Sequence, residues 1–332
     1  MSDGFNLRLR RPRPSVVACS PTLGALGAVN LMPACFAKED ALEARIARSS
    51  RRRRAVSVLL RWLTYAAATV TAAVLLFVVG YILVRGVPAL TPDLFQWEYT
   101  SENVSLLPAL ASTVIMALLA LALAVPVGVG AAIYLVEYAR RGSRFVRLVR
   151  VTAETLQGIP SIIYGLFGML FFVTACGWGL SLLSGACTLA IMVLPVIMRT
   201  TEEALMAVPD SYREGGFGLG AGRLRTVARC VLPSAVPGIL GGVILALGRC
   251  VGEVAALLFT AGTVAQIPDF AGQGIFALFD SCRTLAVHMY TLACEGLHVN
   301  EAYATSVVLL ILVLLLNAAM RVVAQKMEVS KK

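Results

Sequence analysis

Residues 209–237, with the sequence PDSYREGGFGLGAGRLRTVARCVLPSAVP, form a polar, arginine-bearing stretch between two long apolar runs. Within this stretch Ser211 and Glu214 have the spacing of a capping box. In that motif a hydroxyl and a carboxylate three residues apart each satisfy a free N–H at the start of a helix. We therefore expect a short helix to begin at Ser211.

The second half of the stretch predicts a reversal and another short helix. Gly220 and Gly222 allow the chain to turn sharply. Residues 222–231 can form a helix, which Pro233 and Pro237 are expected to terminate because proline lacks the N–H that a continuing helix needs. The stretch is thus predicted to be a helix-turn-helix hairpin on a membrane surface, and an ordinary amphipathic surface loop is the alternative.

The composition is that of a membrane protein. Of the 332 residues 58% are hydrophobic, whereas soluble domains are about half apolar. The apolar runs are each about 20 residues or longer, which is enough to cross a bilayer as a helix. We predict an all-α integral membrane protein with six transmembrane helices. The predicted spans are residues 56–84, 106–138, 151–176, 180–198, 236–261 and 302–324.

The net charge of +10 follows the predicted topology. Between the spans, the loops of one side carry Arg85 and Arg283 and are otherwise neutral or acidic. Lysine and arginine gather on the cytoplasmic side of membrane proteins. Both termini and the loop 209–237 are therefore predicted to be cytoplasmic, and nucleic-acid binding is the weaker interpretation. The basic residues of this side are Arg51–Arg54, Arg140, Arg141, Arg144, Arg147, Arg150, Arg223, Arg225, Arg229, Arg321, Lys326, Lys331 and Lys332.

Residues 1–50 form a basic tail that precedes the membrane region, residues 51–332. An apolar patch in the tail is similar to a secretory signal peptide. Cleavage there would place Arg51–Arg54 on the outer side, against the charge bias. We expect a disordered cytoplasmic extension, or a start codon assigned too far upstream.

The eight cysteines and two histidines do not form a metal-binding pattern, since the sequence has no Cys-x-x-Cys pair. Cys176 with Cys187, and Cys282 with Cys294, lie near the predicted outer face, where either pair could form a disulfide. We expect unpaired thiols instead, and no metal site.

The stretch 209–237 also resembles the cytoplasmic coupling loop of ABC importer permeases. Its signature is Glu-Ala-Ala, three residues, Gly, nine residues, an aliphatic residue, one residue and Leu-Pro. Here both alanines are glycine and the aliphatic residue is Cys230, and each glycine lowers helix propensity by up to about 1 kcal/mol. The resemblance implies a type I ABC importer permease with a coupling-helix loop at 209–237. The residues implied to couple to an ATPase are Ser211, Glu214, Gly215, Gly216, Gly220, Leu232 and Pro233.

Three further segments narrow the resemblance. Residues 158–162 read Gly-Ile-Pro-Ser-Ile, residues 199–202 read Arg-Thr-Thr-Glu, and residues 248–253 read Gly-Arg-Cys-Val-Gly-Glu. Together they resemble the permeases of phosphate-specific ABC importers, the PstA type more than its PstC sister, over about residues 61–326. The resemblance implies inward movement of inorganic phosphate across the bacterial inner membrane by alternating access.

The same resemblance implies partners. These are a second permease subunit of PstC type, two ATPase subunits of PstB type and an external phosphate-binding protein of PstS type. None of the four lysines follows a glycine, so the sequence lacks the P-loop that holds ATP. We therefore expect no cofactor and no enzyme activity in this chain, with ATP hydrolysed on a partner subunit.

Arg249 and Glu253 lie within an apolar run, where a central charge costs about 2.5–3.5 kcal/mol on insertion scales. They are four residues apart and are expected to share a helix face. A guanidinium binds phosphate oxygens bidentately, and Glu253 can accept a hydrogen bond from the protonated oxygen of hydrogen phosphate, which sulfate lacks. We expect both to line the substrate pathway. The alternative is a private ion pair that holds the bundle together.

Arg199 and Glu202 lie at the cytoplasmic end of the fourth predicted span. The resemblance implies that they belong to the exit of the pathway, and snorkelling interface charges are the alternative.

Other functions stay open at this point. The chain could be the sister phosphate permease or a permease for another oxyanion. A membrane-embedded enzyme would need a motif such as HExxH or GxSxG, and the sequence has neither. As a docking scaffold or sensor without transport, it would keep the hairpin while Arg249 became dispensable for uptake.

Overall fold

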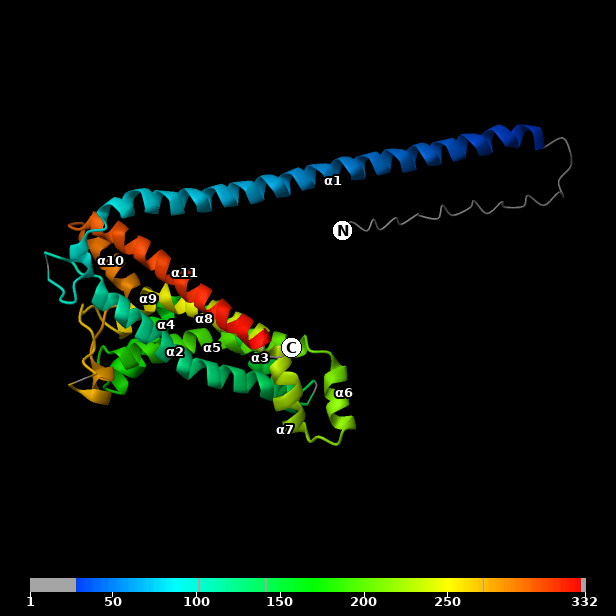
Figure 1. Cartoon of the computed structure of the whole chain (residues 1–332). Coiled ribbons are helices and arrows are strands. Elements are labelled where there is room, and N and C mark those ends of the chain that lie inside the picture. Colours follow the sequence, from blue (N-terminus) through cyan, green and yellow to red (C-terminus); the bar gives the residue numbers. More distant parts are fainter. Residues whose placement is uncertain (1–27, 101, 141, 271, 330–332) are drawn as a thin grey trace. The chain divides into compact units, whose positions relative to one another are not determined.

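The computed structural model describes residues 28–100, 102–140, 142–270 and 272–329 (Figure 1). All regular secondary structure in these residues is helical, which confirms the predicted all-α fold. The chain divides into two units, Met1–Leu76 and Phe77–Lys332. Helix α1, Ala28–Gly86, runs through the boundary between them.

The helices of the second unit follow in the order α2 (Leu107–Ile133), α3 (Arg144–Gln157), α4 (Ser161–Gly168), α5 (Leu182–Met206), α6 (Asp210–Gly218), α7 (Arg223–Thr226), α8 (Leu232–Val251), α9 (Ala255–Thr260), α10 (Leu285–Glu295) and α11 (Val299–Val329). Three π-helical segments extend α2, α4 and α7. They are η3 (Tyr134–Tyr138), η4 (Met169–Ala175) and η5 (Val227–Val231). Short 3₁₀ turns are η1 (Val87–Ala89), η2 (Pro92–Phe95) and η6 (Gly274–Phe279).

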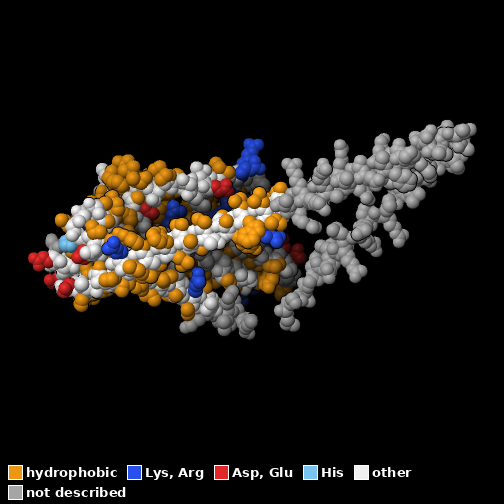
Figure 2. All heavy atoms as spheres, turned by 90° about the horizontal axis from the view of Figure 1, so that it is seen from above, with side chains coloured by type: hydrophobic (Ala, Val, Ile, Leu, Met, Phe, Trp, Pro, Cys, Tyr) orange, Lys and Arg blue, Asp and Glu red, His pale blue; other side chains and the backbone are white. Residues whose placement is uncertain are grey.

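Five helical runs among the described residues are long and apolar enough to cross a membrane. A sixth candidate is the pair Arg144–Gln157 and Ser161–Ala175, which is bent by 101°. Hydrophobic side chains cover much of the face shown in Figure 2, as expected where lipid replaces water. The five runs are Val56–Ala89, Leu107–Tyr138, Leu182–Met206, Arg223–Val251 and Val299–Val322.

Two predicted spans are interrupted in the structure. The span predicted at 151–176 is divided between α3 and α4, because Pro160 disfavours helical backbone at the residue before it and has no N–H of its own. The span predicted at 236–261 ends as a helix at Val251, where Gly252 is the C-cap, and α9 follows as a separate short helix. Both breaks lie inside the described bundle.

The predicted disordered tail is also partly wrong. Helix α1 begins at Ala28, so residues 28–50 are helical, whereas residues 1–27 lie outside the described part of the chain. The segment from Ala37 to Arg48 consists mostly of alanine, leucine, glutamate, lysine and arginine, which are strong helix formers.

Helix α5 is the centre of the bundle. In its most apolar stretch 72% of the residues are buried, against 39% or less in the other candidate spans. It packs against α2 and α8 over most of its length, and also against α3, α4 and α9. The Ser181 hydroxyl caps its start by accepting the Ser184 N–H at 3.2 Å.

Helices α5 and α8 approach closely because α8 presents two glycines one turn apart. A Cβ on Gly238 would lie 2.6 Å from Cβ of Ala204, and one on Gly242 would lie 2.7 Å from Cβ of Thr200. Ala204 and Thr200 are likewise four residues apart, so small residues face small residues along the contact. This is the usual way in which membrane helices bring their backbones together.

The contact predicts that Gly242 tolerates no larger side chain, whereas its neighbour Gly241 does. Gly242→Val should lower the free energy of unfolding by about 1–3 kcal/mol, since even its Cβ would lie 2.7 Å from Cβ of Thr200. Gly241→Val is the matched control, because a Cβ there meets no atom within 4 Å. Denaturant unfolding of the purified protein in detergent measures both, and equal losses would contradict the packing described.

Candidate functional site

The stretch 209–237 forms a hairpin of α6 and α7 that projects from one end of the bundle (Figure 1). The chain reverses at Gly220, whose φ of 78° is left-handed, as predicted for that residue. Gly222 instead has extended backbone and occupies the N-cap position of α7. One glycine makes the turn, and the other starts the second helix.

The predicted capping box does not form. Helix α6 begins at Asp210, one residue before Ser211, and Pro209 occupies the N-cap position without a side-chain cap. Proline suits the start of a helix because its φ is fixed and it has no N–H to satisfy. The Asp210 carboxylate in the first turn is favourable at the positive end of the helix dipole. Ser211 and Glu214 are therefore exposed residues within α6.

The prolines after α7 do not end the helix, which also contradicts the prediction. Helix α7 continues through η5 into α8, giving one helical run, Arg223–Val251. Pro233 and Leu232 lie at the start of α8, directly after the π-helical turn, where the wider turn accommodates the missing N–H of proline. The Ser234 hydroxyl donates to the Cys230 carbonyl at 2.9 Å in the same region.

The two glycines that replace alanine in the coupling signature lie in different surroundings. A Cβ on Gly215 would meet no atom within 4 Å, and the residue is exposed. A Cβ on Gly216 would lie 2.6 Å from Cγ2 and 2.8 Å from Oγ1 of the buried Thr226 on α7. Gly216 thus lets α6 and α7 touch, whereas Gly215 only weakens the helix.

Replacing Gly215 and Gly216 with the alanines of the coupling signature should therefore have opposite effects on the stability of the hairpin. Gly215→Ala is expected to stabilise α6 by up to about 1 kcal/mol through helix propensity. Gly216→Ala is expected to destabilise the hairpin by about 1–3 kcal/mol by crowding Thr226. Hydrogen–deuterium exchange of the amides in residues 210–231 reports both changes.

The double variant Gly216→Ala/Thr226→Ala is the control for this pair. It removes the crowded atoms, and Thr226 Oγ1 has no hydrogen-bond partner among the described residues that would be lost. Exchange in this variant should return toward the parent. Parental exchange in Gly216→Ala alone would refute the contact.

Arg213 of α6 attaches the hairpin to the bundle. Its Nε and Nη2 atoms donate to one carboxylate oxygen of Glu137 at 3.0 and 2.8 Å. Nη1 donates to Asp210 at 3.0 Å and to the Val208 carbonyl at 2.9 Å, and Nη2 also donates to the Leu205 carbonyl at 2.9 Å. The hydrogen bonds that Arg213 donates to the Glu137 carboxylate raise the pKa of Arg213, so its guanidinium stays charged. One guanidinium therefore joins α6 to the ends of both α5 and α2.

Neither Arg213 nor Glu137 was predicted from the sequence as a functional residue. Glu137 is 7% exposed and lies in η3, at the end of the second span. The available signal was an acidic residue at the boundary of an apolar run, just before a cluster of arginines, because a buried carboxylate at such a place needs a cationic partner. Nothing in the spacing of 76 residues names Arg213 as that partner.

Removing one member of this pair should cost more than removing both. Arg213→Gln leaves the buried Glu137 carboxylate unpaired, and we expect a loss of about 3 kcal/mol in unfolding free energy. In Arg213→Gln/Glu137→Gln the uncompensated charge is gone, so part of that stability should return. Denaturant unfolding in detergent measures the four corners of the cycle.

Arg225→Gln is the matched control for loss of charge, because Arg225 is exposed and makes no ion pair among the described residues. It should stay within about 0.5 kcal/mol of the parent. Additive losses in the double variant would mean that the pair is not coupled.

Arg199 and Glu202 point to different partners on α3. Arg199 donates to Glu203 at 2.9 Å and pairs with Glu154, whereas the buried Glu202 pairs with Arg150. The structure does not bring Arg199 and Glu202 together. The ion pairs instead tie the end of α5 to α3.

Arg249 and Glu253 do not share a helix face, because α8 ends at Val251 between them. Arg249 is half-buried in the last turn of α8, and no acidic side chain in the described residues lies within ion-pair distance of it. Glu253 is 9% exposed and lies in the break, where one carboxylate oxygen accepts the Ala256 N–H of α9 at 3.2 Å. The private ion pair is absent, and Glu253 supports the short helix.

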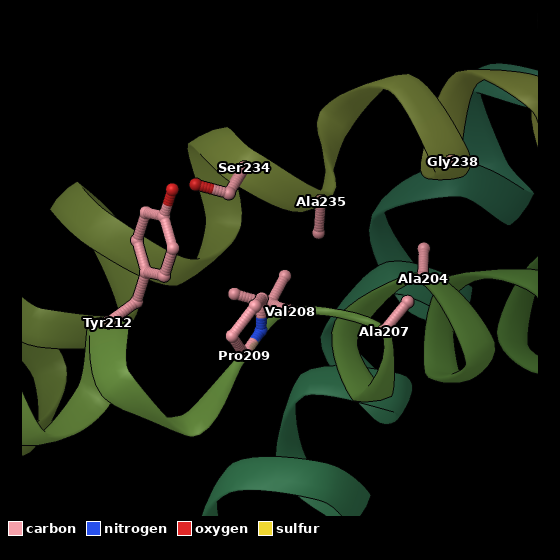
Figure 3. A pocket seen from close by; sticks show the side chains of 8 residues that line it. All are labelled: Ala204, Ala207, Val208, Pro209, Tyr212, Ser234, Ala235 and Gly238. Carbon is pink, nitrogen blue, oxygen red and sulfur yellow. The ribbon is translucent and has the colours of Figure 1, made fainter.

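A cavity of about 350 Å³ opens where the hairpin meets the bundle (Figure 3). Tyr212 and Ser234 lie with their hydroxyl groups toward each other on one side of it. No charged side chain lines it, so it is unsuited to a phosphate ion. The lining residues are Ala204, Ala207, Val208, Pro209, Tyr212, Ser234, Ala235 and Gly238.

Comparison with known proteins gives the class of this chain. Residues 124–329 match the family described as "Binding-protein-dependent transport system inner membrane component". The chain belongs to this family: it is a multi-pass inner membrane permease of a binding-protein-dependent ABC importer. The permease component is distinct from the ATPase, and ATP belongs to a separate subunit.

Named relatives give a finer view. The "Probable ABC transporter permease protein YqgI" of Bacillus subtilis (strain 168) is 35% identical over 268 residues, 76% of this chain and 90% of the relative. The "Phosphate transport system permease protein PstA" of Mycobacterium leprae (strain TN) is 33% identical over 65% of this chain and 71% of its own length. The "Phosphate transport system permease protein PstC" of Mesorhizobium japonicum is 31% identical over 70% and 77%.

Solved structures agree on the fold. An inward-facing structure of the MetNI methionine ABC transporter aligns with a TM-score of 0.51 and 20% identity, over 74% of this chain and 96% of that chain. A bacterial ABC transporter involved in alginate import aligns with a TM-score of 0.53 and 18% identity, over 78% and 95%. The architecture is that of ABC importer permeases.

Proposed function

We propose that this chain is a PstA-type permease subunit that moves inorganic phosphate inward by alternating access. In this proposal its partners are a PstC-type permease, two PstB-type ATPase subunits and an external PstS-type phosphate-binding protein. Relatives named as phosphate permeases support the substrate. The arginine distribution supports cytoplasmic termini and a cytoplasmic hairpin.

The observation that carries the proposal is the unpaired state of Arg249. A guanidinium within an apolar span is costly, and a purely structural arginine would be expected to have an acidic partner. Arg249 has none in the described residues, and it lies immediately before the break in the fifth span. A cation held without a counter-ion beside a helix break is suited to receive an anion transiently.

Glu253 adds chemical selectivity in this proposal. Within the described part of the chain only one of its carboxylate oxygens is engaged, by the Ala256 N–H, which leaves the other able to accept a hydrogen bond from a protonated phosphate oxygen. A fully deprotonated oxyanion such as sulfate offers no such donor and meets repulsion from the carboxylate. Arg249 thus supplies attraction, and Glu253 rejects the wrong anion.

The hairpin is proposed to receive the movement of the ATPase. Ser211, Glu214, Gly215 and Gly220 are exposed on it and are available for docking. Gly216, Leu232 and Pro233 support its internal packing and its junction with α8. Arg199 and Glu202 are proposed to act at the exit through their ion pairs with α3, which hold the α5 end until the pathway opens.

Replacing Arg249 tests the pathway assignment. In cells that carry the complete transporter, Arg249→Gln is expected to lower uptake of radiolabelled phosphate at least about tenfold, the order of one lost charge-assisted contact. Arg249→Lys should retain part of the uptake, since it keeps the charge but not the bidentate geometry. Arg321→Gln, at an exposed position on α11, is the matched control and should transport as the parent does.

Competition by unlabelled anions separates phosphate from other substrates. Arsenate, which also carries a proton at neutral pH, should compete with labelled phosphate, whereas sulfate should not. Parental uptake by an Arg249→Gln variant present at normal levels in the membrane would refute the pathway role. Equal competition by sulfate would refute phosphate selectivity.

A further inference from the structure

Helix α3, Arg144–Gln157, differs from the rest of the bundle in its direction. It meets the apolar limb Ser161–Ala175 at 101°. If that limb crosses the bilayer, a bend close to a right angle lays α3 nearly parallel to the membrane surface. Its arginine-rich first half is too polar to occupy the hydrocarbon core, which is consistent with a position at the interface.

One face of α3 packs on the bundle. Val146 and Ala153 are buried, and the half-buried Val149 and Leu156 lie on the same side, which faces α5. These positions recur at helical spacing, three or four residues apart. Because this side of α3 packs on the bundle, the opposite side faces outward.

The outward side carries large apolar residues. Phe145, Leu148 and Val151 are 57%, 64% and 53% exposed. Three such residues in two turns of one short helix are unfavourable in water, at about 25 cal/mol per Å² of apolar surface. This side needs a covering that is itself apolar.

Arginines accompany these apolar residues. Arg144 and Arg147 are exposed, and neither makes an ion pair with the described residues, nor does Arg140 just before the helix. Arg150 differs, because it is held by Glu202. Unpaired cations beside exposed apolar side chains require a partner that presents negative charge and hydrocarbon together.

A cavity of about 260 Å³ adjoins the first turn of α3. Arg140 and Arg150 lie on its lining together with the apolar side chains of Leu135, Val146 and Met206. The cavity therefore combines guanidinium groups with an apolar wall, at the same end of α3 as the unpaired arginines. A phosphodiester with its attached glycerol matches that combination.

We propose that α3 is a membrane-surface helix that binds anionic phospholipid of the adjoining leaflet. Phe145 and Leu148 enter the boundary between headgroups and acyl chains, while Arg140, Arg144 and Arg147 bind headgroup phosphates. A protein subunit fits this side less well, because the side presents exposed apolar residues together with unpaired arginines, the combination found in helices that lie on anionic bilayers. The inference does not depend on which substrate the permease transports.

Photocrosslinking in native membranes tests the occupant. Benzoylphenylalanine replaces Phe145 in the complete transporter, and the adducts are identified by mass spectrometry after irradiation. The expected adduct at Phe145 is phospholipid. Leu219, 91% exposed at the turn of the hairpin, is the control position and should give no lipid adduct. An adduct at Phe145 with a protein subunit would overturn the proposal and identify a docking surface instead.

Nanodiscs that contain both phosphatidylglycerol and phosphatidylcholine test the preference for anionic lipid. The ratio of the two adducts at Phe145 is the readout, and it should favour phosphatidylglycerol in the parent. Arg144→Gln/Arg147→Gln should lower that ratio about 30-fold, the order expected for two arginines at a membrane surface. Arg225→Gln/Arg321→Gln removes the same charge elsewhere and should leave the ratio unchanged. A parental ratio equal to the bulk composition would also overturn the proposal.

Discussion

In a bilayer every backbone N–H and C=O must be satisfied by the protein itself, and this constraint shapes the two helix breaks inside the bundle. At the break between α3 and α4 the Tyr164 hydroxyl donates to the Leu156 carbonyl at 2.8 Å. The side-chain amide of Gln157, at the end of α3, donates to the Pro195 carbonyl of α5 at 3.0 Å. At the break after α8, Glu253 accepts a free N–H of α9. Side chains therefore hydrogen-bond to backbone groups at both of these breaks.

A single helical run connects the hairpin to Arg249, which has no ion-pair partner among the described residues. The run Arg223–Val251 is one uninterrupted helix of 29 residues, with Thr226 packed on Gly216 at one end and Arg249 near the other. At 1.5 Å per residue it reaches about 40 Å. Because α8 also packs closely on the central α5, this helix connects the hairpin to the core of the bundle. Arg213 fixes the other limb of the hairpin to α5 and α2.

The sequence was sufficient for the helical fold, for the approximate positions of the candidate spans and for the reversal at Gly220, because these follow from long apolar runs and from glycine stereochemistry. The sequence was insufficient where neighbouring residues or tertiary contacts override a local sequence motif. Ser211 and Glu214 match a capping box, but the helix already begins at Asp210, with Pro209 at the N-cap position. Pro233 predicts the end of a helix, but the π-helical segment η5 just before it accommodates the proline, and the helix continues. The partnership of Arg213 with Glu137 depends on tertiary structure alone, and no local pattern contains it.

The long separation between Glu137 and Arg213 also bears on how the protein is made. Glu137 leaves the ribosome 76 residues ahead of the guanidinium that neutralises it. At bacterial translation rates of about 5–20 residues per second, that interval lasts about 4 to 15 seconds. Throughout it the nascent chain holds an uncompensated carboxylate at the end of α2, and the pair closes only after α5 has been synthesised. The last carbonyls of α5 and the first turn of α6 then meet on a single side chain.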